Sequence, residues 1–132
     1  MELFFKKNKK NNVITPKRKI GNLGEEIAKK YFKKQGYKII KQNFTNRAGE
    51  IDLIVKEKNQ IIFVEVKTRT NQNFGYPEES IDSRKQNKII RAAQNYLFEK
   101  KIISENYRFD VISVEINQLT KKASIRHIKN AF

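Results

Sequence analysis

The run Ile61-Ile62-Phe63-Val64-Glu65-Val66-Lys67 limits most strongly the folds that are open to this chain. Side chains of a strand point alternately to its two faces, so a continuous apolar run predicts a strand that is buried on both faces. Such a strand lies inside a sheet that is covered on both sides. Glu65 and Lys67 interrupt the run, and charged side chains in a central strand are costly, so this pair needs a reason.

Hydrophobic periodicity along the chain predicts two helices and five strands in the order αβββαββ. The first helix begins at Pro16, after an N-capping Thr15, and ends before Gly36. The second helix covers about 82–100. The predicted strands are 38–44, 50–58, 61–70, 107–116 and 124–129. The predicted fold class is therefore α/β, with a mixed central sheet that is flanked by two helices. Phe44, Phe63 and Phe109 are assigned to its core.

The chain is strongly basic, with 29 Lys and Arg residues against 14 Asp and Glu residues and a formal net charge of +15. Such a surface attracts polyanions, so nucleic acid is the expected partner. Residues 1–15 are interpreted as a basic, disordered arm and 16–132 as one domain. As a function the arm could add phosphate contacts, and as the simpler alternative it is a solvated tail; the sequence leaves both open.

The residue types that the sequence lacks exclude several kinds of site. The chain has no cysteine and one histidine, His127, which excludes disulfides, thiolate metal sites and sites with several histidines. The apolar run 61–64 is too short to cross a bilayer, and 3–5 is too short for the core of a signal peptide. We therefore expect a cytoplasmic protein without a membrane partner.

Two acids on neighbouring strands suggest a metal site. A tight turn at Lys58-Asn59 places Asp52 directly opposite Glu65, with Cβ atoms about 4.5–5.5 Å apart. Two carboxylates at this distance repel each other unless a positive charge lies between them. Mg²⁺ fits this role, because it takes oxygen ligands and needs only one or two carboxylates besides water and phosphate.

Alternation along the two strands sorts their side chains by face. Asp52 is predicted to lie on the face opposite to that of three apolar neighbours, Ile51, Leu53 and Val55. On the following strand, Lys67 shares the face of Glu65, and Arg69 follows one step further. The simpler alternative to a catalytic group is an exposed face on which Lys67 neutralises Glu65.

The residues around these acids carry a family resemblance. The segments 49–52 (Gly-Glu-Ile-Asp) and 63–69 (Phe-Val-Glu-Val-Lys-Thr-Arg) resemble the signature of the PD-(D/E)xK nuclease superfamily, although Ile51 stands where the superfamily has its proline. More narrowly, residues 20–114 resemble the YraN-like family of uncharacterised bacterial endonuclease-like proteins, which is similar in fold to archaeal Holliday-junction resolvases. The further matching stretches are 21–25, 74–77, Lys85, 92–93, 96–97 and 108–111. The resemblance implies a restriction-endonuclease-like αβββαβ core.

The resemblance also implies an activity. The implied activity is that of a Mg²⁺-dependent endonuclease, with Mn²⁺ as a substitute, that hydrolyses phosphodiester bonds in DNA. Branched or recombination intermediates are among the candidate substrates. Asp52 and Glu65 match the metal-binding acids, and Lys67 matches the catalytic lysine. Glu25 matches a further catalytic and metal-binding acid that some members supply from the first helix. The basic side chains expected to contact nucleic acid are Arg69, Lys85, Arg47, Lys17, Arg18 and Lys19.

For several side chains the sequence leaves two roles open. Glu25 could be a surface charge, and Glu50 could be a further ligand or merely an acid at a strand end. Lys85 falls within the apolar stripe of the second helix, so it either points toward the site or extends its amine to water. Tyr76 could stack on a base or cap the fold.

Other functions suit the same composition. A nucleic-acid-binding accessory protein that keeps the nuclease fold without turnover fits the charge equally well. RNA could replace DNA, because contacts to the backbone carry no base code. A resolvase-like activity would ask for a homodimer, but no dimer surface is identified from the sequence. Arg108 and Asp110 share a strand face and are expected to form a structural pair.

Overall fold

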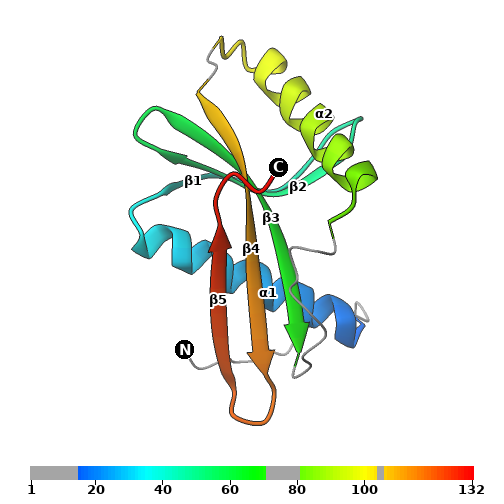
Figure 1. Cartoon of the computed structure of the whole chain (residues 1–132), viewed down its shortest axis with the longest axis vertical. Helices are drawn as coiled ribbons and strands as arrows, with labels where there is room; N and C mark the ends of the chain where they lie inside the picture. The colour runs from blue at the N-terminus through cyan, green and yellow to red at the C-terminus, as the bar shows by residue number, and fades with distance from the viewer. Residues whose placement is uncertain (1–14, 71–80, 104–105) are drawn as a thin grey trace, which may run out of the picture.

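The computed structural model describes residues 15–70, 81–103 and 106–132 (Figure 1). Its elements are α1 (Pro16–Lys34), β1 (Lys38–Thr45), β2 (Glu50–Glu57), β3 (Gln60–Thr70), α2 (Ser83–Glu99), β4 (Tyr107–Asn117) and β5 (Lys122–Ile128). The predicted order αβββαββ is confirmed, and each predicted boundary lies within two residues of the observed one. The predicted basic arm lies outside the described residues except for Thr15.

The first helix begins and ends where its local chemistry predicts. The Thr15 hydroxyl accepts a hydrogen bond from the backbone N–H of Arg18 at 3.2 Å, and Pro16 occupies the first helical position. At the other end Gly36 has φ +91°, a conformation that residues with a side chain rarely adopt. In the described part of the chain, neither helix is both long and apolar enough to cross a membrane.

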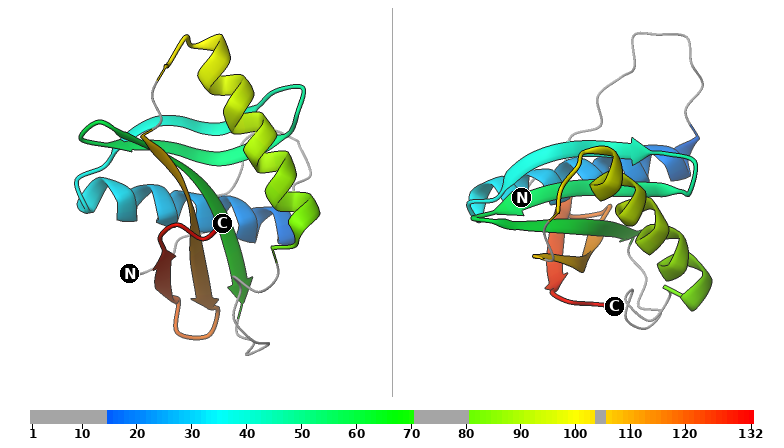
Figure 2. Two further views of the ribbon diagram at one scale, coloured as in Figure 1. Left: turned by 45° about the horizontal axis from the view of Figure 1, so that its top comes forward. Right: turned by 90° about the horizontal axis from the view of Figure 1, so that it is seen from above.

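The five strands form one mixed sheet in the order β1-β2-β3-β4-β5. Only β3 and β4 are parallel, with register pairs that run from Ile61–Tyr107 to Thr70–Ile116. Helix α2 lies between these two strands in the sequence, as a parallel connection requires. Figure 2 shows the β1–β2 hairpin running across the direction of β4 and β5.

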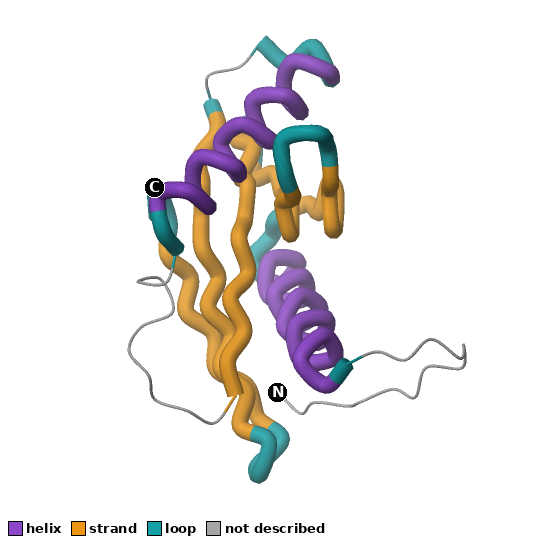
Figure 3. The backbone as a smooth tube through the Cα atoms, turned by 90° about the vertical axis from the view of Figure 1, so that its right-hand side faces the viewer, coloured by secondary structure: helices purple, strands orange, loops and turns teal. Residues whose placement is uncertain are grey.

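The two helices cover opposite faces of the sheet (Figure 3). Residues 61–66 of β3 are all buried, as expected of a central strand, and their side chains alternate between the two cores. On the α1 side the core includes Phe32 and Val64, and on the α2 side it includes Phe63, Tyr96 and Phe109. Of the predicted core residues, Phe63 and Phe109 are buried; the third is Phe44, which is partly buried against Tyr96.

Strands β2 and β3 pair only over part of their length. The register from Glu57–Gln60 to Leu53–Val64 is the one that the tight turn predicts. The β2–β3 ladder ends at the pair Leu53–Val64, whereas β2 stays paired with β1 as far as Glu50. The first residues of β2 therefore follow β1 away from β3, and Asp52 is the first residue beyond the last pair.

The predicted alternation of β2 is wrong at one position. The alternation predicts Ile51, Leu53 and Val55 on one face. Leu53 and Val55 do belong to the core under α1, but Ile51 belongs to the core under α2. The change of face occurs opposite Asn43, which has φ +52° in the middle of β1. The β1–β2 register is the same on both sides of Asn43, and the register shift of this pair lies between Ile39 and Lys41.

Candidate active site

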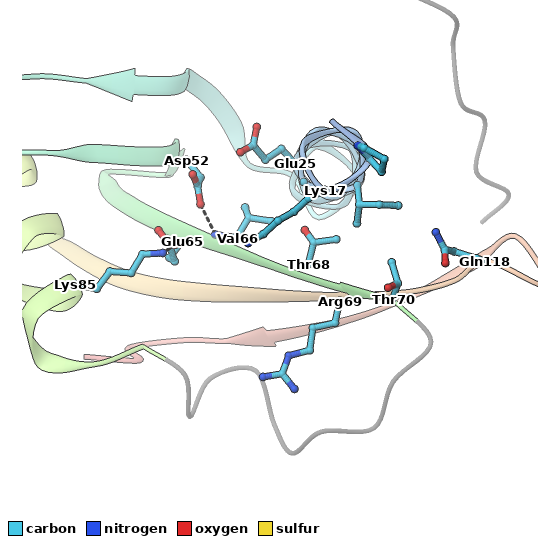
Figure 4. Close-up of a pocket in the computed structure, with 13 residues that line it drawn as sticks. Lys17, Glu25, Asp52, Glu65, Val66, Thr68, Arg69, Thr70, Lys85 and Gln118 are labelled. Carbon is cyan, nitrogen blue, oxygen red and sulfur yellow. Dashed lines mark hydrogen bonds and ion pairs between the residues drawn. The ribbon is translucent and has the colours of Figure 1, made fainter. Parts of the chain in front are cut away.

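An open pocket of about 860 Å³ lies where β2 leaves β3, between the N-terminal half of α1 and the start of α2 (Figure 4). Its wall includes the backbone and side chains of both strands. Of the ten side chains predicted to act in the site, six line it: Lys17, Glu25, Asp52, Glu65, Arg69 and Lys85. Residues that are far apart in the sequence thus meet in one place.

Asp52 is held by the strand from which β2 has separated. Its Oδ2 accepts a hydrogen bond from the backbone N–H of Val66 at 2.8 Å (Figure 4), so the side chain takes a donor that the ladder no longer uses. Burial raises the pKa of Asp52, and the charge of Glu65 raises it further, to about 7, although the bond from Val66 opposes the shift. This carboxyl therefore holds a proton more readily than an exposed aspartate does.

Glu65 has a single strong partner among the described ion pairs. Its Oε1 lies 2.6 Å from Nζ of Lys85, and the Glu65 side chain is 6% exposed, whereas that of Lys85 is 44% exposed. Of the two interpretations of Lys85, the structure supports the one in which the amine points toward the site. The simpler alternative, an exposed face, is wrong because Glu65 is buried; its ion pair is with Lys85 on α2, and Lys67 interacts with it through charge.

Contact with Glu65 also changes the pKa of Lys85. Burial alone would lower this pKa, but the hydrogen bond and the charge of Glu65 outweigh burial, so the pKa is raised above its ordinary value. Lys85 is therefore fully charged at neutral pH and acts as the counter-ion of a buried carboxylate.

Lys67 follows on β3, half-buried, outside the lining of the pocket. Burial lowers the pKa of its amine, and the neighbouring amine of Lys85 lowers it further, while Glu65 and Asp52 oppose the shift. Lys67 thus lies within electrostatic reach of both acids, and it releases a proton more easily than an exposed lysine.

Glu25 reaches the pocket from α1, next to the close approach of Gly24 to Thr68 on β3. A Cβ atom added at Gly24 would lie 2.8 Å from Cβ of Thr68, so only glycine allows this approach. Burial raises the pKa of Glu25; a hydrogen bond from Asn43 lowers it, and the charge of Glu65 raises it. Glu25 therefore interacts with the acids on the strands rather than with solvent alone.

Sequence reasoning missed Asn43. Its left-handed backbone lies in β1 between the register pairs Gln42–Leu53 and Phe44–Ile51, so it sits opposite Asp52. Asparagine is the residue other than glycine that tolerates this conformation best. The signal in the sequence for this irregular position was an asparagine in the middle of a predicted strand.

The remaining predicted residues do not line the pocket. Arg18 acts on Glu25 only through its charge, and Lys19 is exposed on α1. Arg47 is exposed in the turn between β1 and β2, and Glu50 is exposed at the start of β2. Tyr76 lies outside the described residues.

The acids suit a hard cation only in part. Within the described ranges, no three His, Asp or Glu side chains gather closely enough to hold a metal ion, so Glu25 does not complete a three-acid set. Asp52 and Glu65 nevertheless repel each other, since the charge of Glu65 raises the pKa of Asp52. Oxygen donors that repel each other fit a divalent cation that is bound by two carboxylates, water and phosphate.

Comparison with known proteins gives consistent matches along the chain. Residues 24–114 match the family described as "Uncharacterised protein family UPF0102". A UPF0102 protein of Caldanaerobacter subterraneus subsp. tengcongensis is 49% identical over 118 residues, which are 88% of this chain and 96% of that protein. A UPF0102 protein of Clostridium botulinum (strain 657 / Type Ba4) is 52% identical over 114 residues, which are 86% of this chain and 93% of that protein.

Proposed function

This chain belongs to the uncharacterised protein family UPF0102, and we propose that it is a Mg²⁺-dependent endonuclease that hydrolyses phosphodiester bonds in DNA. The observation that carries the proposal is the meeting of Asp52 and Glu65, from two separating strands, in one pocket of a chain with a net charge of +15. Acids that bind a cation and a surface that binds a polyanion are the two requirements of such an enzyme.

Asp52 and Glu65 would hold the cation, together with the backbone carbonyl of Val66. Asp52 keeps Oδ1 for this purpose, because Oδ2 is engaged by Val66 N–H. Glu25, on the α1 side of the pocket, would bind through water. When bound, a divalent cation supplies positive charge to the scissile phosphate and lowers the pKa of a water molecule.

The two lysines would act on the phosphate and on the attacking water. Lys67, whose pKa is lowered by burial, is suited to hold the water and to exchange a proton at Nζ. Lys85 has a half-exposed side chain, so its amine can leave Glu65 and contact a phosphate oxygen. Lys17 and Arg69 extend the positive charge along the wall of the pocket.

The first test is a cleavage assay with Mg²⁺ or Mn²⁺ on branched, flapped, linear and single-stranded DNA. We expect cleavage of at least one substrate and a loss of 100-fold or more, in order of magnitude, in Glu65→Gln and in Lys67→Met. The matched controls are Glu99→Gln and Lys122→Met, which change exposed residues away from the pocket and should keep full activity. If no DNA is cut, or if the two site variants cut like wild type, the proposal fails.

One observation favours a second candidate, a non-catalytic nucleic-acid-binding accessory protein. Glu65 already has a cationic partner in Lys85, at 2.6 Å, and so does not need a metal for charge balance. Calorimetry with Mn²⁺ separates the two functions. Binding that is lost in Asp52→Ala supports the enzyme, whereas DNA binding that is indifferent to divalent ions and to this substitution supports the accessory protein.

A further inference from the structure

Helix α2 carries a row of basic residues on the part of its surface that faces solvent. Arg84, Lys88 and Arg91 are all exposed, and their spacing of four and then three residues places them on one face of the helix. From Ser83 to Phe98 the helix contains no acid. The row spans about 10 Å, which corresponds to about three successive phosphates of one DNA strand.

A rigid turn adds a fourth basic residue to this row. Asn46 donates from Nδ2 to the backbone carbonyl of Ala92 at 3.0 Å, and its Oδ1 accepts the backbone N–H groups of Ala48 at 2.9 Å and Gly49 at 3.2 Å. The turn between β1 and β2 is thereby fixed against α2. Arg47 follows Asn46 in this turn and is exposed.

The row begins at the pocket. Lys85, next to Arg84, directs its amine into the pocket and contacts Glu65 at 2.6 Å (Figure 4). One face of α2 thus reaches the acids while the neighbouring face carries the basic row. A nucleic acid strand with a phosphate in the pocket would continue along Arg84, Lys88 and Arg91.

The choice of side chain supports phosphate contact. Only seven of the 29 basic residues of the chain are arginines, and three of those seven are Arg47, Arg84 and Arg91. Arginine binds a phosphate through two parallel hydrogen bonds, which lysine cannot do. A solvated surface has no need of that geometry.

We infer that Arg84, Lys88 and Arg91 of α2, with Arg47, form the surface along which a DNA backbone leaves the pocket, an inference that rests on the proposed function. These four residues are called the α2 basic row. The helix α1 has a comparable basic group at its far end, Lys30, Lys33 and Lys34, which are also exposed. The pocket is lined by α1 residues only between Pro16 and Glu25, so this group is not continuous with it.

The test compares two full-length variants with equal charge loss. One is Arg84→Gln/Lys88→Gln/Arg91→Gln and the other is Lys30→Gln/Lys33→Gln/Lys34→Gln. Binding to a labelled DNA duplex is measured by fluorescence anisotropy in EDTA, across a series of salt concentrations. The α2 variant should lose at least tenfold in affinity relative to the α1 variant, and the slope of log K against log salt should fall in magnitude by about 2 to 3.

A charge-preserving variant controls for folding. Arg84→Lys/Lys88→Arg/Arg91→Lys should keep the salt slope of wild type; a slope that falls as far as in the glutamine variant overturns the inference. Equal losses in the α1 and α2 variants also overturn it, while leaving the proposed function intact. If the wild-type chain binds no DNA, the proposed function fails as well. Loss of binding to anionic lipid vesicles, but not to DNA, in the α2 variant would assign the row to a membrane surface and overturn the inference.

Discussion

Two acids on the same sheet, the buried Asp110 and the partly buried Asp52, have opposite electrostatic environments. Asp110 on β4 is fully buried, and its partners among the described residues donate hydrogen bonds to its carboxylate or carry positive charge. Asp52 on β2 has one backbone donor and lies beside another carboxylate, that of Glu65. The pKa of Asp110 is lowered, and that of Asp52 is raised to about 7.

The partners of Asp110 explain the first shift. Arg108 donates from Nε to Oδ1 at 3.0 Å, His127 Nε2 lies 2.7 Å from Oδ2, and the backbone N–H of Asn130 donates to Oδ1 at 3.1 Å. Burial alone would raise the pKa of Asp110, but the contacts with His127 and Arg108 outweigh it. Tyr31 completes the cluster with a 3.0 Å hydrogen bond to Nδ1 of His127.

The difference between the two acids agrees with a structural role for Asp110 and with the role proposed here for Asp52. The Asp110 cluster is closed, since its charges and hydrogen bonds are satisfied within the protein, and the predicted structural pairing with Arg108 is confirmed. Asp52 lines the open pocket, where burial and the neighbouring carboxylate of Glu65 both disfavour its charged form. Perturbed carboxylates in a pocket are where bound cations and reactive groups are expected.

The largest expected effect comes from breaking the closed cluster. Asp110→Ala should reduce the free energy of unfolding by roughly 3–5 kcal/mol, because it removes the acid partner of Arg108 and His127, whose side chains are only 11% and 7% exposed. Urea unfolding measures the change. Glu99→Gln, an exposed substitution, should change stability by less than about 0.5 kcal/mol. A loss below about 1 kcal/mol in Asp110→Ala would show that the cluster is not structural.

The second prediction concerns the pH dependence of stability. In the unfolded chain Asp52 ionises near its ordinary pKa of 3.8, whereas in the folded chain it keeps its proton to about pH 7. The wild-type protein therefore loses stability as the pH rises between these values. Asp52→Asn keeps an oxygen that can accept the Val66 N–H and lacks this loss. It should be more stable than wild type by roughly 2 kcal/mol at pH 8, below a ceiling of about 4 kcal/mol, and equal to it below pH 4.

Unfolding of both proteins by urea at pH 4, 6 and 8 without divalent ions gives the comparison. Addition of Mg²⁺ at pH 8 should stabilise wild type and leave Asp52→Asn unchanged. A difference in stability that does not grow with pH would contradict the raised pKa. For Asp110 the sign is opposite, since its lowered pKa contributes stability above pH 4 that is lost as the pH falls further.

The smallest predicted effect concerns Lys85 as a competitor of the cation. Lys85→Met keeps an apolar stem and removes the positive charge that lies 2.6 Å from Glu65. Mn²⁺ affinity, measured by calorimetry, should rise about tenfold, or by about 1.4 kcal/mol, because the ion no longer displaces an amine. Lys88→Met, one turn further along α2, is the control and should bind Mn²⁺ like wild type. Unchanged or weaker binding in Lys85→Met would show that Lys85 supports the cation site rather than competing for it.

Much of the fold could be predicted because it depends on local patterns. Apolar periodicity and capping residues marked the elements, and the family match confirms the resemblance to the YraN-like family. The register of β2 and β3 followed from the turn at Lys58, whose φ of +54° allows a tight connection. That register predicts Asp52 directly opposite Glu65; the two acids are neighbours in the pocket, although the ladder ends one pair earlier, at Leu53–Val64.

The parts that could not be predicted depend on contacts between distant segments. The partner of Glu65 is Lys85, which is 20 residues away and on another element, and the partners of Asp110 include His127 on β5. The left-handed backbone of Asn43, opposite the position at which β2 changes face, leaves no mark in the apolar pattern. Net charge predicted that basic residues bind nucleic acid, but not which ones, so Lys19 and Arg47 were grouped with side chains that line the pocket.

The tight contact between α1 and β3 makes Gly24 as important to the pocket as the acids. Any larger residue there would collide with Thr68 and push the helix outward, and Glu25, the next residue, would move with it. A mutational scan for loss of activity should therefore identify Gly24 as readily as a catalytic acid. Gly24 would contribute the short distance between the backbones of α1 and β3, and a residue with a side chain cannot restore that distance.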